Sequence, residues 1–151
     1  MDHRAELMKL EDERWRELDS LIEKLTPEQL EQPGLNKEGW SAKDMMWHIG
    51  CWAAEAAREL DRVRMGTYED WDWGDDRTNR MNQEFLEAGK NVDLATAKAE
   101  MHAARTRALQ TFSALPEVTP AAVEWFGESG HEHYDEHLPE LRAWVAKLTG
   151  G

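Results

Sequence analysis

The stretch SAKDMMWHIGCWAAEAARELDRVRMG, residues 41–66, has the pattern of a long amphipathic helix. Ser41 with a carboxylate three residues later is a variant of the capping box that starts helices, and Gly66 is suited to ending one. Apolar side chains recur at helical spacing along a single stripe, which consists of Ala42, Met45, Ile49, Trp52, Ala56, Leu60 and Val63. We therefore predict a helix with one face in the core of the protein.

Three other stretches have the same apolar spacing. They cover about residues 2–25, the segment from Asp93 to residue 115, and about residues 130–148. A shorter helix is expected at about residues 77–88, whereas TPAAVEWFGESG, residues 119–130, should form one short turn of helix and a loop. No stretch alternates as a strand does. We therefore predict an all-α fold for a single domain over residues 1–151: an up-and-down four-helix bundle with a short extra helix between helices two and three.

The composition limits the partners. Lys and Arg number 18 against 31 Asp and Glu, so the net charge is -13, which disfavours nucleic acid as a partner. No apolar run is long enough to cross a bilayer, no basic amphipathic stretch suits a membrane surface, and the first ten residues do not resemble a signal peptide. We expect a soluble cytoplasmic protein that binds a small molecule. The eight tryptophans either fill the core or line a pocket.

The histidines point to a metal site. In HEHYDEH, residues 131–137, His133 and His137 are four residues apart and share the helix face that continues to Leu141 and Trp144. His48 borders the stripe of the helix at 41–66. Three inward imidazoles suit a divalent cation, although His48 taken alone also fits a hydrogen-bonded core residue. HYDEH also matches an inverted zinc-protease pattern, but only 14 residues remain for the further ligand that this pattern needs.

Three charged residues interrupt apolar faces: Glu11 and Arg14 in the first helix, and Arg105 in the third. They form a buried ion-pair network, or they line a pocket beside the metal as candidate catalytic and substrate-binding groups. Met45, Trp52 and Trp144 neighbour the histidines and are expected to line that pocket. Pro139 removes a helical N–H just after His137 and predicts a local kink.

Two motifs resemble one known family. GWSAKDMMWHIGCW, residues 39–52, and GHEHYDEHLPELRAW, residues 130–144, resemble the second and last helices of the DinB/YfiT-like superfamily, in particular its ClbS/DfsB-like members. The resemblance implies a four-helix bundle, often a dimer, with Zn or Ni held by three histidines, here His48, His133 and His137. Members include transferases that use low-molecular-weight thiols such as bacillithiol or mycothiol, hydrolases that disarm reactive small molecules, and many proteins without a known activity.

Three ligands leave open positions on an ion, as in catalytic sites. We therefore expect a divalent-metal-dependent enzyme that activates a thiol or water for transfer to, or hydrolysis of, a small electrophile. The alternative is a non-catalytic, metal-binding or stress-associated bundle whose ion stabilises the fold. A third hypothesis is a bundle that binds an apolar ligand without metal.

Overall fold

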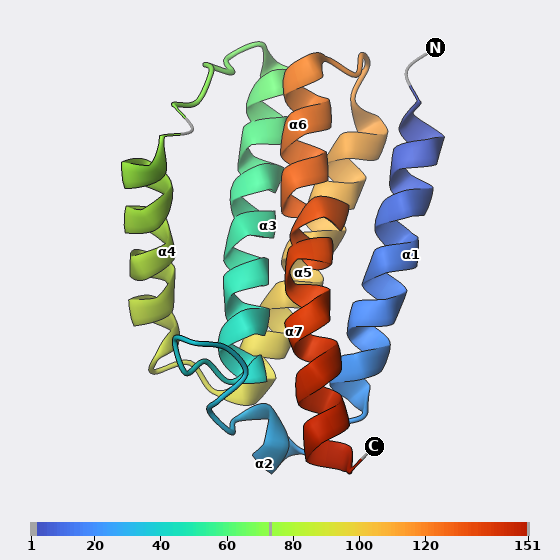
Figure 1. The fold of residues 1–151 in the computed structure, drawn as a ribbon. Coiled ribbons are helices and arrows are strands. Elements are labelled where there is room, and N and C mark those ends of the chain that lie inside the picture. Colours follow the sequence, from blue (N-terminus) through green and yellow to red (C-terminus); the bar gives the residue numbers. More distant parts are fainter. Residues whose placement is uncertain (1–2, 73, 151) are drawn as a thin grey trace.

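The computed structural model describes residues 3–72 and 74–150, and these residues form helices joined by loops (Figure 1). In chain order the helices are α1 (Arg4–Glu23), α2 (Pro27–Leu30), α3 (Ala42–Met65), α4 (Asp75–Gly89), α5 (Leu94–Ala114), α6 (Pro120–Ser129) and α7 (His131–Thr149). The predicted all-α bundle with a shorter helix between its second and third long helices is confirmed. The predicted start of the first helix at residue 2 lies outside the described residues.

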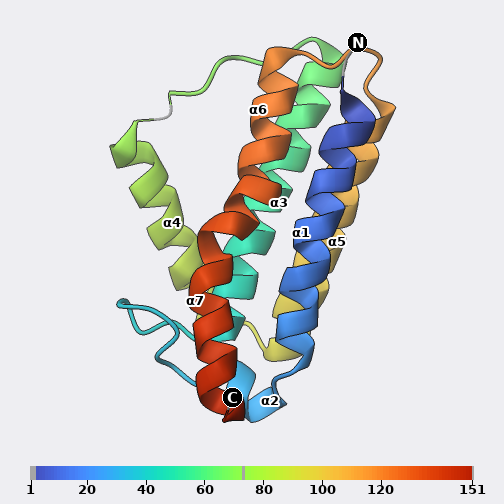
Figure 2. The same ribbon diagram turned by 45° about the vertical axis from the view of Figure 1, so that its right-hand side comes forward.

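The bundle consists of α1, α3, α5 and the consecutive pair α6 and α7, with α4 on its outside (Figures 1 and 2). Each long helix, α4 included, runs opposite to the long helix before it, with α6 and α7 taken together as one pass (Figure 1). Because α4 makes one of these passes, α3 and α5 run in the same direction (Figure 1). The closest packing joins α3 to α5 and α1 to α7. A Cβ added at Gly50 of α3 would lie 3.0 Å from the Cα of Met101 in α5, so glycine lets these two backbones approach closely.

The segment predicted as one turn and a loop is instead a helix of ten residues, α6. Thr119 caps it by accepting a hydrogen bond from the backbone N–H of Ala122, and Pro120 occupies the first turn, where its missing N–H is harmless. Ala122, Trp125 and Phe126 are buried at helical spacing. The sequence-based prediction was wrong because its proline and glycines suggested a loop, whereas this proline begins the helix.

A single residue separates α6 from α7. Gly130 has φ −102° and ψ −114°, outside the helical region, and the chain turns there into the second half of this pass. Helix α7 then continues through Pro139 to Thr149, so the proline does not end it. Pro139 and Asp135 are both exposed, so water can reach the carbonyl group that lost its helical partner. The local kink at Pro139 stays a prediction.

Two apolar clusters form the core. One includes Met45, Ile49 and Leu138, and the other includes Trp52 and Phe126. Residues of both clusters flank His48 in α3, so this histidine lies where they meet. Among the described residues, no helix is both long and apolar enough to cross a membrane.

Candidate metal centre

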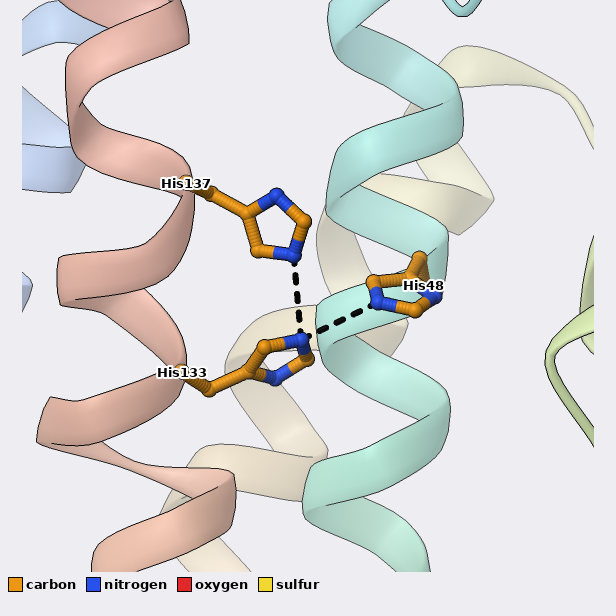
Figure 3. A group of neighbouring side chains, drawn as sticks. All are labelled: His48, His133 and His137. Carbon is orange, nitrogen blue, oxygen red and sulfur yellow. Dashed lines mark hydrogen bonds between the residues drawn. The ribbon is translucent and has the colours of Figure 1, made fainter. Parts of the chain in front are cut away.

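The three histidines predicted as ligands lie together in the bundle (Figure 3). His48 projects from α3, and His133 and His137 project toward it from α7, one turn apart. Nε2 of His133 is 3.0 Å from Nε2 of His48 and 3.1 Å from Nε2 of His137. The ligand atoms of the three rings all lie within 4.8 Å of one another. His48, His133 and His137 are only 9%, 7% and 8% exposed, respectively.

Local sequence signals position His48. The backbone N–H of Asp44 donates to Oγ of Ser41, and the backbone N–H of Ser41 donates to Oδ2 of Asp44. This complete capping box sets where α3 begins. Because the helical repeat is fixed from that point, His48 comes about two turns into the helix on its inward face.

Burial keeps His48 and His133 neutral. Burial, with a smaller contribution from the nearby His137, lowers the pKa of His48 to about 3. Burial also holds the pKa of His133 well below its ordinary value, with His48 and His137 as further causes. Both of these rings are therefore uncharged, the form in which histidine binds metals.

Neutral rings leave a hydrogen-bonding conflict at the centre of the site. Nδ1 of His137 lies 2.9 Å from Oε1 of Glu140, which places the proton of a neutral His137 on Nδ1 and a lone pair on Nε2. The single proton of His133 cannot serve both its neighbours and its own Nδ1, and Nδ1 is buried without a partner among the described residues. A cation that accepts all three Nε2 lone pairs would remove the conflict between the three rings.

The donor set fits a divalent transition metal. A tetrahedral zinc ion with bonds of about 2.0–2.1 Å separates its ligand atoms by about 3.3 Å, close to the two shortest nitrogen distances here. The group of possible ligands in the described part of the chain contains these three histidines and no fourth residue. Three imidazoles would leave a position open for a small molecule.

Two cavities give access to the histidines. The smaller, of about 200 Å³, is lined by His48 and His133 with Trp52, Thr78, Asn82, Trp125, Glu128, Ser129 and Glu136. The larger, of about 940 Å³, is lined on one side by His137 and shares His48, Asn82 and Glu136 with the smaller. Helix α4 supplies part of both walls, and Nε1 of Trp52 holds it in place by donating to Oδ1 of Asn82 at 2.7 Å.

Of the three predicted pocket residues, one lines a histidine cavity. Trp52 lines the smaller cavity, but Met45 and Trp144 line neither cavity among the described residues. Met45 is fully buried in the apolar core, because the apolar stripe of α3 is wider than the cavity wall. Trp144 lies about two turns beyond His137 and packs against Gly34, where an added Cβ would be 2.9 Å from its ring.

The predicted catalytic candidates Glu11, Arg14 and Arg105 form ion pairs outside the two histidine cavities. Arg105 donates from Nε and Nη2 to the two carboxylate oxygens of Glu11, at 2.8 and 2.7 Å, and the hydroxyl of Tyr134 donates to the same carboxylate at 2.8 Å. Arg14 pairs with Asp135 near the surface, with Nε 2.8 Å from Oδ1. None of these residues lines a histidine cavity, although Glu11 and Arg105 line a separate cavity of about 10 Å³. The contacts that the structure shows for them are these ion pairs and hydrogen bonds.

The cavity also contains residues that the sequence did not reveal. Thr78 and Asn82 come from α4, Glu128 comes from α6, and Glu136 lies between the two histidines of α7. No spacing rule connects α4 or α6 to the histidines, so these residues become visible only in the folded chain. Cys51 has no catalytic environment, because burial raises the pKa of its thiol to about 11, with a smaller contribution from Glu100.

Comparisons with known proteins agree with this fold. The family model of the DinB superfamily matches residues 10–149. A solved structure of an uncharacterised protein from Escherichia coli UTI89 is similar, with a TM-score of 0.81 at 16% sequence identity over 99% of this chain and 96% of that one. At this identity the likeness shows the fold alone. No curated protein matches the sequence. The family model covers nearly the whole chain, and three histidines converge inside the bundle. This chain therefore belongs to the DinB superfamily.

Proposed function

We propose that this protein is a divalent-metal-dependent enzyme that adds a thiol or water to a small electrophilic molecule. The observation that supports it best is the convergence of three buried imidazoles beside a cavity large enough for a small molecule. A purely structural metal site is closed by four protein ligands, whereas the described residues offer three. An ion bound there would lower the pKa of a thiol or water and supply a nucleophile near neutral pH.

The residues of the chain have separate tasks in this proposal. His48, His133 and His137 hold the ion, with Zn or Ni as its expected identity. Glu140 orients His137 by accepting from Nδ1, which directs Nε2 to the ion. Trp52 and Trp125 exclude water from one side of the cavity. A transferase would need an external low-molecular-weight thiol, because the Cys51 thiol stays protonated.

The first test is metal analysis of protein purified without added metal. We expect about one equivalent of a transition metal in the parent chain and its loss in the His133→Ala, His137→Ala double variant. His131→Ala is the matched control, because this histidine is in the same helix but outside the ligand group. It should retain the metal.

Activity is tested next with the metal-loaded protein, using panels of thiols and small electrophiles and a water-only reaction. Turnover that the double variant loses and His131→Ala retains would support the enzyme, and the thiol requirement would separate a transferase from a hydrolase. A parent that fails to take up Zn or Ni would refute the metal site. A parent that binds the metal and gains thermal stability, but converts no substrate, would favour the non-catalytic metal-binding bundle.

Some finer expectations complete the proposal. A single domain over residues 1–151, a cytoplasmic location and a homodimer are expected from composition and from the family resemblance. The acidic net charge also argues against nucleic acid as a partner. Gel filtration with light scattering would test the dimer directly.

A further inference from the structure

The cavity beside the histidines is acidic at its rim. Of the described residues that line the smaller cavity, Glu128 and Glu136 carry negative charges and none is lysine or arginine. The larger cavity adds Glu38 and Glu140 against a single Lys37. Carboxylates at the mouth raise the local concentration of cations and repel anions. The lining of these cavities therefore favours the binding of cationic molecules over anionic ones.

Two further acidic residues, Glu124 and Glu132, lie near Glu128. Burial raises the pKa of its carboxyl group, and the neighbouring Glu124 and Glu132 raise it further. A positive group placed beside Glu128 would relieve that repulsion. Arg14 and Arg105 do not supply this positive group, since Arg14 is paired with Asp135 and Arg105 with Glu11.

Aromatic rings form another wall of the same cavity. The indole N–H groups of Trp52 and Trp125 donate to Asn82 and Tyr68, so the rings can offer a ligand little besides their surfaces. Ring faces attract cations. The aromatic cluster already does so once, because the guanidinium carbon of Arg77 lies 3.7 Å from the ring centroid of Trp71. The ring centroids of Trp71 and Trp125 are 4.6 Å apart.

We propose that the substrate of this site carries a positively charged amine or ammonium group. That group lies between the carboxylates of Glu128 and Glu136 and the rings of Trp52 and Trp125. The opposite, reactive end of the molecule faces His48. This placement of the reactive end rests on the proposed function, whereas the charge preference rests only on the lining. A metal ion at the histidines would make the inner end of the site positive and leave its rim negative.

The test compares three probes of the same shape: benzylamine, benzyl alcohol and benzoate. Their binding to chelator-treated protein is measured at low salt by tryptophan fluorescence and by calorimetry, since metal-free protein cannot bind benzoate through the ion. We expect benzylamine to bind about tenfold more tightly than benzyl alcohol, and benzoate to bind most weakly. Added salt should reduce the advantage of benzylamine.

Variants assign the preference to the cavity. The Glu128→Gln, Glu136→Gln double variant should bind benzylamine no more tightly than benzyl alcohol. Glu124→Gln is the control, because it makes the same change of charge one turn earlier in α6 at an exposed residue outside the cavity lining. It should keep most of the preference.

Benzoate binding as tightly as benzylamine, absence of benzylamine binding, or an unchanged preference in the double variant would each overturn the inference. The outcome is independent of metal. A protein that prefers benzylamine but takes up no metal would leave the charge preference standing and refute the proposed enzyme.

Discussion

Replacing Glu11 with glutamine removes the negative charge at the centre of a buried network and should destabilise the fold strongly. The Glu11 carboxylate is 2% exposed and accepts two hydrogen bonds from Arg105 and one from Tyr134. Glutamine keeps the shape but has one acceptor oxygen, and its NH₂ group meets donors instead of acceptors. The Arg105 guanidinium, whose side chain is 17% exposed, then loses its main partner.

The structure sets the expected size of the loss. Breaking a buried ion pair by removing one partner costs about 3–5 kcal/mol. Arg105 retains Asp12, with Nη2 3.3 Å from Oδ1, so we expect the lower end, about 3 kcal/mol. For a chain of this length that corresponds to a decrease in Tm of about 6–12 °C. Urea unfolding followed by circular dichroism would measure the free energy of unfolding, and calorimetry would measure Tm.

Two further variants serve as comparisons for this prediction. Arg14→Gln breaks an exposed pair and should cost at most about 1 kcal/mol. The triple variant Glu11→Leu, Arg105→Met, Tyr134→Phe removes Glu11 together with both of its hydrogen-bond donors and should be more stable than Glu11→Leu alone. The reasoning would be refuted if Glu11→Gln cost no more than Arg14→Gln. Metal content should be unchanged in Glu11→Gln, because Glu11 lines neither histidine cavity.

The remaining predictions concern acid stability and helix packing. Folded His48 takes up a proton only near pH 3, whereas the unfolded chain does so near its ordinary pKa of 6.5, so the stability of metal-free protein should fall as pH decreases through this window. Between pH 6.5 and 5.5 this histidine contributes about 1 kcal/mol of that loss, and His48→Gln should reduce the slope of the free energy of unfolding against pH by a similar amount; an unchanged slope would contradict the assignment. Gly50→Ala should lower the free energy of unfolding by about 1 kcal/mol, because its Cβ would press on the backbone of Met101; a higher Tm in thermal unfolding would show that α3 and α5 can move apart.

Much of the fold follows from local sequence. The capping box at Ser41 and the apolar stripe after it predicted α3 within a residue at each end, and Asp93 and Pro116 bracketed α5 in the same way. These signals act within one helix, so they can be read without knowing its neighbours. The prediction failed at α6, where proline and glycine are compatible with both a loop and a capped helix.

The histidines were also accessible to sequence reasoning. A spacing of four residues puts His133 and His137 on one face, and the position of His48 beside an apolar stripe turns it inward. The charged residues were harder to place. Glu11 and Arg105 both face inward, but only the packing of α1 against α5 and α7 decided that they bind each other and Tyr134.

The sequence by itself therefore determined the long helices α1, α3, α5 and α7, their inward faces and the three imidazoles that could share an ion. Only the tertiary structure decided what surrounds that site: the wall from α4, the acidic rim from Glu128 and Glu136, and the exclusion of Met45 and Trp144. The physical reason is the range of the interactions. Helical repeat and capping act over a few neighbouring residues, whereas a cavity is the space left between helices whose contacts join residues far apart in the chain.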